Sequence, residues 1–98
     1  MMDFLVRIDV RLPPDFDGEA RDSLIRREAE RAKELAEAGV IRRLWRIPGR
    51  WSNVGIWSAD DATVLHEAIS SLPLYLWLDV VVTPLAAHPN DPSAVLGN

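Results

Sequence analysis

The first strand is the feature that most constrains the fold of this chain. Between Asp3 and Leu12, apolar and polar side chains alternate, as they do in a strand with one face against a core. The apolar positions are Phe4, Val6, Ile8, Val10 and Leu12, and the polar ones are Arg7, Asp9 and Arg11. Pro13 and Pro14 end the strand, because proline has no N–H to donate to a sheet. The chain therefore opens with a strand that is buried on one face.

Five further elements follow this strand. Asp15 or Asp17 caps a helix that Gly39 terminates, and Ser58, Asp60 or Asp61 caps a second helix. The expected ranges are a strand at 3–12, a helix to about 38, strands at 40–47 and 51–57, a helix to about 72 and a strand at 77–85. This order predicts one α+β domain, residues 1–98, with the ferredoxin-like βαββαβ arrangement. Both helices then cover one face of an antiparallel sheet, and an irregular tail begins at about residue 86.

The other face of this sheet has no helix to cover it. Trp51 and Trp57 are expected there, beside Arg7 and Arg11. A tryptophan-bearing face open to water is an unusual surface patch, and such patches mark contacts with other proteins. The pattern therefore predicts that another subunit covers this face.

Composition excludes several classes of function. The chain has no cysteine, so it has no disulfide, thiolate metal site or cysteine nucleophile. A formal net charge of −4 argues against nonspecific nucleic-acid binding, and no apolar run is long enough to span a bilayer. Two histidines make a poor metal site, and neither a G-x-S-x-G motif nor a glycine-rich phosphate loop is present. Since the N-terminus lacks the marks of a secretion leader, we expect a cytoplasmic protein with a small-molecule or protein partner.

Glu28 breaks the pattern of the first helix. On a helical wheel it lies in the apolar sector, within roughly 40° of Leu24 and Leu35. Glutamate is rarely buried without a partner, because removing the carboxylate from water is costly. One interpretation is a structural ion pair with Arg31, Arg46 or another arginine. The other is a general base in an apolar pocket, with its pKa raised by burial toward the range useful for proton transfer.

Other candidate residues are less distinctive. His66, on the second helix, is either a proton shuttle or hydrogen-bond donor, or an ordinary helix histidine at a subunit contact. Arg7, Arg11 and Arg46 are suited to bind a substrate carboxylate through paired hydrogen bonds. The alternative for these arginines is pairing with Asp9, Asp79 or Glu28. His88, in the tail, is either solvated or reaches a neighbouring subunit.

Several segments together resemble the muconolactone Δ-isomerase family. The most specific is Gly39–Gly49, in which a glycine, a Leu-Trp-Arg core at 44–46 and a glycine turn follow one another. The other segments are the first strand with its two arginines and Pro13, then Asn53, Leu65-His66, Leu72-Pro73-Leu74, Asp79 and His88-Pro89. The likeness runs from the N-terminus to about Pro89.

The resemblance implies a function. Counting back from Gly39, Glu28 falls on the family's proton-carrying glutamate. The implied activity is the conversion of muconolactone to the enol-lactone of 3-oxoadipate in the β-ketoadipate route of aromatic catabolism. The family uses no metal or organic cofactor and assembles as a ring-like homodecamer. On this basis Trp45, Asn53, His66 or a backbone N–H would stabilise the enolate, and Arg7 or Arg46 would hold the substrate carboxylate.

The chain departs from the family pattern at three places, and other functions stay open. The neighbours of Glu28, Arg26-Arg27 and Ala29-Glu30-Arg31, are not typical of the family. Tyr75-Leu76-Trp77 replaces an aromatic-proline-aromatic run, and Arg50-Trp51-Ser52 replaces a smaller or tyrosine-type segment. These differences concern the identity of the substrate more than the fold. The alternatives are a non-catalytic oligomeric binding module, the related chloromuconolactone dehalogenase, and a cofactor-free oxygenase.

Overall fold

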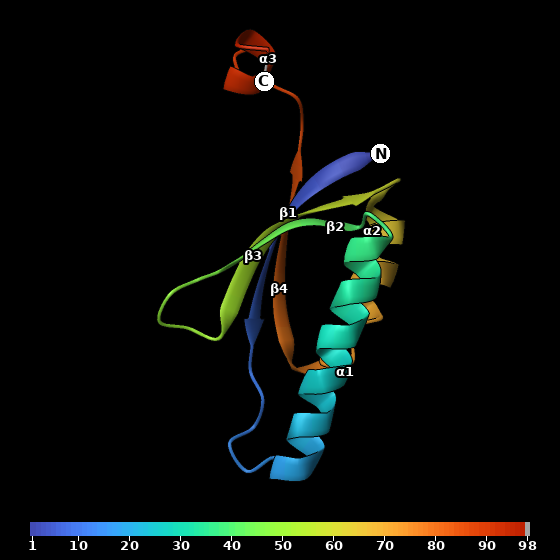
Figure 1. Ribbon diagram of the computed structural model, residues 1–98, viewed down its shortest axis with the longest axis vertical. Coiled ribbons are helices and arrows are strands. Elements are labelled where there is room, and N and C mark those ends of the chain that lie inside the picture. The colour runs from blue at the N-terminus through green and yellow to red at the C-terminus, as the bar shows by residue number, and fades with distance from the viewer. Residues whose placement is uncertain (98) are drawn as a thin grey trace.

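A computed structural model describes residues 1–97 and shows one four-stranded antiparallel sheet with two long helices on one side (Figure 1). The strand order is β2-β3-β1-β4, so the first strand is central. The elements are β1 (Met2–Val10), α1 (Gly18–Glu37), β2 (Ile41–Arg46), β3 (Ser52–Ala59), α2 (Ala62–Ser70), the short 3₁₀ helix η1 (Tyr75–Trp77), β4 (Leu78–Leu85) and α3 (Pro92–Val95). The predicted ferredoxin-like α+β fold is confirmed.

The ends of the long helices follow from local chemistry. Asp17 accepts a hydrogen bond from the Ala20 N–H, and Asp61 accepts one from the Val64 N–H, so each aspartate caps a first turn. Gly39 has a φ of 79°, which glycine adopts without steric cost, and the Val40 N–H then bonds back to the Leu35 carbonyl. α2 ends at Ser70, two residues earlier than expected, and η1 follows it.

The core lies between the sheet and the helices. Phe4, Val6 and Ile8 point into it from β1, as the alternation predicts. The helices and the segment after α2 contribute Leu35, Leu65, Ile69 and Leu72.

The expectation that Trp57 and Trp51 lie on the uncovered face is wrong. Trp57 pairs in register with Phe4, so both side chains point toward the helices, and Trp57 is only 1% exposed. Trp51 lies in the bend before β3, where the Arg21 guanidinium of α1 stacks 5.2 Å from its ring centre. The register with β1 determines the orientation of Trp57, and the position of the turn determines that of Trp51. Neither can be predicted from the residue type alone.

The uncovered face of the sheet is nevertheless partly apolar. Val54 and Val81 lie in register with Arg7 there, and Trp45, opposite Val54, is 45% exposed with the Arg43 guanidinium 4.6 Å from its ring centre. A shallow hollow of about 320 Å³ is lined by Leu5, Arg7, Ile47, Val54, Val81 and Thr83. The face therefore does carry a tryptophan, but it is Trp45.

The C-terminal segment extends away from the body of the molecule (Figure 1). The tail was expected to be irregular, but Pro92–Val95 forms the short helix α3. Asp91 caps it through the Ser93 N–H, and proline occupies the first turn, where its missing N–H is harmless. Among residues 1–97, no helix has the length and apolar character needed to cross a membrane.

Candidate active site

Glu28 lies near the middle of α1 and is half-buried. Its Oε1 atom accepts a hydrogen bond of 2.9 Å from the backbone N–H of Leu74. Burial raises the pKa of Glu28, and the hydrogen bond from Leu74 lowers it by a smaller amount, so the net shift is upward. Within residues 1–97, no arginine, lysine or histidine pairs with this carboxylate, so the ion-pair interpretation finds no partner there.

The Leu74 N–H is held in place by the segment that leaves α2. Pro73 cannot continue the helix, and the buried side chains of Leu72 and Leu74 anchor the turn in the core. The Tyr75 N–H bonds to the Leu72 carbonyl at 2.9 Å and closes the turn. A rigid backbone donor therefore faces α1 at the level of Glu28.

Asn53 and Arg46 lie opposite each other on β3 and β2, on the side of the sheet that faces the helices. The Asn53 Oδ1 atom is buried and has no hydrogen-bond partner among the described residues. The same holds for the Trp57 Nε1 atom, four residues further along the same face of β3. Buried polar atoms without partners are rare in proteins and call for an explanation, which a bound polar ligand would supply.

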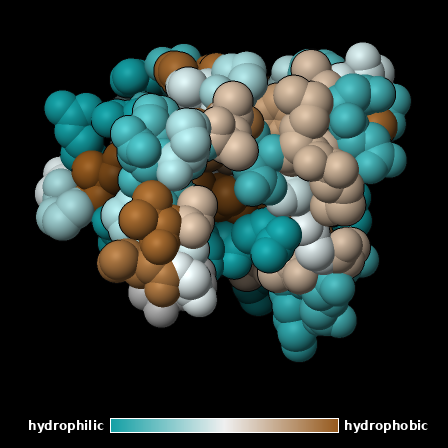
Figure 2. Space-filling model, turned by 90° about the horizontal axis from the view of Figure 1, so that it is seen from above, coloured by the Kyte–Doolittle hydropathy of each residue, from teal (hydrophilic) through white to brown (hydrophobic). Residues whose placement is uncertain are grey.

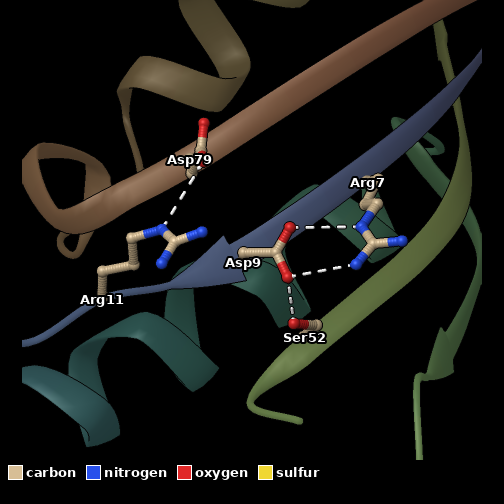
Figure 3. Close-up of polar contacts among 5 residues, drawn as sticks. All are labelled: Arg7, Asp9, Arg11, Ser52 and Asp79. Atoms are coloured by element: carbon tan, nitrogen blue, oxygen red, sulfur yellow. Dashed lines mark hydrogen bonds and ion pairs between the residues drawn. The ribbon is translucent and has the colours of Figure 1, made fainter.

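Two of the expected substrate-binding residues point the other way. Arg7 lies on the uncovered face, and its Nε atom is 3.1 Å from Asp9 Oδ2 (Figure 3). Ser52 also donates to Asp9, and Arg11 pairs with Asp79 at 3.5 Å (Figure 3). The hydrogen bonds from Arg7 and Ser52 lower the pKa of Asp9. Trp45 shares this face, so the structure separates Arg7 and Trp45 from Glu28 by the thickness of the sheet.

His66 lies on the exposed side of α2 and contacts the Tyr75 ring edge-to-face, with the ring centres 6.2 Å apart. It borders a hollow of about 310 Å³ between α2 and β4, whose other walls are apolar: Ala62, Leu65, Ile69, Val80 and Val82. The structure therefore groups His66 with Tyr75, the residue next to Leu74, and not with Asn53 or Arg46.

Two further hollows are lined by other residues. A groove of about 400 Å³ between α1 and β2 is lined by Ala29 and Ala32, which are respectively adjacent to Glu28 and one helical turn beyond it. This volume is in the range of small-molecule sites. A larger hollow, about 850 Å³, is at the base of the C-terminal segment and includes His88. Viewed from the end that carries this segment, the surface mixes apolar and polar side chains (Figure 2).

Within residues 1–97, no three histidine, aspartate or glutamate side chains come together as a metal ion would require.

The sequence and the fold both match known proteins. A model of the muconolactone delta-isomerase family matches residues 2–91. A muconolactone Delta-isomerase of Rhodococcus opacus is 38% identical over 88 residues, covering 90% of this chain and 95% of that protein. One from Cupriavidus pinatubonensis is 37% identical over 87 residues, covering 89% and 95%. A crystal structure of muconolactone isomerase superposes with a TM-score of 0.86 at 34% identity, covering 92% of this chain and 94% of that one. The chain belongs to the muconolactone Δ-isomerase family.

Proposed function

We propose that this chain is a muconolactone Δ-isomerase and that Glu28 carries the proton. The observation that supports the role of Glu28 most directly is its setting. It is a half-buried carboxylate with a raised pKa, bound by one backbone N–H and unpaired with any cation among residues 1–97. A structural ion pair would lower the pKa of a glutamate, whereas a general base benefits from a raised one. The chain belongs to an isomerase family, and the proton shift expected of that family needs a general base such as this carboxylate.

The reaction is a proton shift within an unsaturated lactone. The carboxylate takes a proton from the ring carbon next to the double bond, and the electron pair moves through the double bonds onto the carbonyl oxygen as an enolate. The same carboxyl then returns the proton to the carbon beside the carbonyl, so the double bond moves and no atom is gained or lost. Oε1 is bound by Leu74, so the other carboxylate oxygen remains available for the transfer.

The enolate oxygen needs a hydrogen-bond donor, which stabilises charge as it develops. The indole N–H of Trp57 is such a donor, because it faces the helices, is buried and has no partner among the described residues. Asn53 faces the same way, but its buried atom without a partner is the acceptor Oδ1, so only its Nδ2 group could donate to the enolate. We therefore favour these two residues over Trp45 and His66, and Trp57 is a candidate that sequence reasoning missed. For the substrate carboxylate we favour Arg46 over Arg7, because Arg46 lies beside Asn53 and Arg7 is occupied by Asp9.

We further propose that the protein is a cytoplasmic homo-oligomer that needs no cofactor. The partly apolar uncovered face supports self-association, and the ring-like decamer is the assembly expected from the family resemblance.

The test is an activity assay with a matched pair of variants. Purified protein should convert muconolactone to its enol-lactone, followed by ultraviolet absorbance or proton NMR. Glu28→Gln keeps the size and polarity of the side chain but removes the base, so kcat should fall by at least about 10²-fold. Glu30→Gln changes an exposed glutamate of the same helix and should leave kcat unchanged.

Two outcomes would contradict the proposal. A folded Glu28→Gln variant that isomerises muconolactone at the parental rate would remove Glu28 from the mechanism. A parental protein that binds muconolactone without turnover would favour the non-catalytic binding module instead.

A further inference from the structure

Packing alone does not fix the position of Glu28. Of the twenty residues of α1, only Leu35 is fully buried, and it lies seven residues after Glu28. At about 1.5 Å per residue, the two side chains are separated by roughly 10 Å along the helix axis. Leu24 and Ile25 are half-buried, so packing locates the middle of α1 only in part, and hydrogen bonds contribute the rest.

Two hydrogen bonds join the middle of α1 to the segment that leaves α2. The Leu74 N–H donates to Glu28 Oε1 at 2.9 Å, and Arg31 Nε donates to Ser71 Oγ at 2.9 Å. The partners are spaced alike, since Glu28 and Arg31 are three residues apart on the helix, and so are Ser71 and Leu74 on the connecting segment. Residues three apart on a helix are neighbours on its surface. The two bonds therefore attach α1 to the 71–74 segment at two adjacent points.

The second attachment is itself fixed at both ends. The Ser71 hydroxyl donates its hydrogen to the Ala68 carbonyl at 2.6 Å, which orients its lone pairs for Arg31. On the other side, the Arg31 guanidinium lies 3.6 Å from Glu34, one turn further along α1. The Arg31 side chain is 34% exposed, so it is partly shielded from water.

We infer that Arg31 is a positioning residue for Glu28, and that its hydrogen bond to Ser71 holds α1 where the Leu74 N–H can bind one carboxylate oxygen. The catalytic consequence rests on the proposed function, whereas the effect on the acidity of Glu28 does not. Without the Arg31–Ser71 bond, α1 is free to move away from Leu74, and Glu28 loses the donor that stabilises its charged form. Its pKa then rises further, and the reactive carboxylate forms only at a higher pH than in the parent.

Several other charged groups lie near α1. On β2, Arg46 lies opposite Asn53, and Arg42 and Arg43 line the groove between α1 and β2 together with Lys33 of α1. His66 is on α2, and the 71–77 segment contributes only Tyr75 as a titratable group. Among residues 1–97, neither Arg46 nor His66 lies within ion-pairing distance of Glu28.

The experiment measures the pKa of Glu28 in five single variants and one double variant. Arg31→Ala and Ser71→Ala each break the bond, and Ser71→Ala does so without changing the charge. Arg27→Ala removes an exposed arginine adjacent to Glu28, and Ser70→Ala removes a hydroxyl that bonds only to the Glu67 carbonyl among the described residues. The pKa is read in substrate-free protein from the carboxyl carbon NMR signal that disappears in Glu28→Gln, and again from the pH dependence of kcat/KM.

We expect Arg31→Ala and Ser71→Ala to raise the pKa of Glu28 by the same amount, and the double variant to raise it no further, because the two residues form one contact. In both variants the pH at which kcat/KM falls on the acid side should move upward by the same amount as the pKa of Glu28, and kcat/KM should recover at higher pH. Arg31→Lys keeps a donor for Ser71 and should lie closer to the parent than Arg31→Ala, while the two control variants should titrate like the parent.

An unchanged pKa in folded Arg31→Ala and Ser71→Ala would overturn the inference, as would an equal rise in Arg27→Ala. The NMR titration needs no substrate, so the positioning role can be tested even if the chain does not act on muconolactone. Conversely, if Glu28→Gln abolishes turnover while Arg31→Ala leaves the pKa unchanged, the proposed function stands and the positioning role falls.

Discussion

At the scale of single residues, the contrast between Glu28 and Asp9 shows how the environment sets acidity. Both carboxyls accept hydrogen bonds, but Glu28 is raised in pKa because burial outweighs one backbone donor. Asp9 is lowered because Arg7 and Ser52 both donate to it. The same functional group is therefore suited to proton transfer in one place and to a permanent ion pair in the other.

The raised pKa of Glu28 predicts a pH-dependent stability. Since the folded pKa lies above the unfolded one, this group favours folding in acid, and the contribution is lost as the pH rises through the folded pKa. Glu28→Gln stays neutral, so its free energy of unfolding should match the parent at about pH 4 and exceed it at about pH 8. Urea melts of both proteins at the two pH values provide the measurement. The Asp9 ion pair is present in the parent and in Glu28→Gln, so its contribution cancels in the difference between their free energies of unfolding. A variant less stable than the parent at about pH 8 would mean that the charged form is favoured in the fold.

Arg46 and Arg7 are predicted to differ in substrate binding. A hydrogen-bonded carboxylate–arginine contact is worth about 1.5–3 kcal/mol, so Arg46→Ala should raise KM roughly 10- to 150-fold. Arg7→Ala should leave KM unchanged, because that guanidinium is bound to Asp9 on the other face of the sheet. Steady-state kinetics of the two variants give both KM values. A raised KM in Arg7→Ala together with an unchanged KM in Arg46→Ala would place the substrate carboxylate on the uncovered face.

The candidate site could be predicted only in part from single residues. The position of Glu28 in an apolar helix sector was readable from periodicity, because it depends on the helix alone. Its partner is a backbone N–H of Leu74, which no side-chain pattern reveals. The separation of Arg7 from Arg46 depends on the register of three strands, with a bulge between Ile41 and Arg43, and a one-residue shift there reverses the face of every side chain.

At the scale of elements, the features that could be predicted are those that neighbouring residues in the sequence determine. The order of elements and the caps at Asp17 and Asp61 followed from neighbouring residues. The face of Trp57 did not, because it is set by pairing with Phe4 more than fifty residues away in sequence. The helix α3 was not predicted, because a tail rich in proline, asparagine and aspartate is typical of irregular chain. In the structure Pro92 occupies the first turn of this short helix, after the capping Asp91.

Gly55 is predicted to be essential to the pairing of β2 with β3. A Cβ atom built there would lie 2.3 Å from the Arg43 carbonyl oxygen and 3.0 Å from Leu44, so the backbone of β2 would have to move. Gly55→Ala should therefore destabilise the fold by about 1–3 kcal/mol and disturb Arg46 and Asn53, which lie on the same pair of strands. Gly18→Ala is the control, since nothing lies within 4 Å of the added atom at the start of α1. Chemical denaturation gives both values, and equal stability of the two variants would contradict the close approach of these strands.

At the scale of the whole molecule, the fold leaves one face of its sheet uncovered and sends the C-terminal segment away from its body (Figure 1). Both features expose apolar side chains, including Val81 at 57% and Leu96 at 69%. A single copy with an extent of 51 Å along its longest axis is elongated for 98 residues. These properties are easier to understand in an assembly than in an isolated chain.

The last prediction concerns the uncovered face. Val81 lies there in register with Arg7, and a lysine in its place would bring a second positive charge into the proposed contact between subunits. Because Val81 is already 57% exposed in one chain, Val81→Lys should fold normally but lose the assembly. Val64→Lys is the control, since Val64 is 40% exposed on α2, on the side of the sheet that carries the helices. Light scattering at micromolar concentration should give an oligomer for the parent and for Val64→Lys, and a smaller mass for Val81→Lys. A parent with the mass of one chain would defeat the proposed oligomer, and an unchanged mass for Val81→Lys would move the contact to another surface.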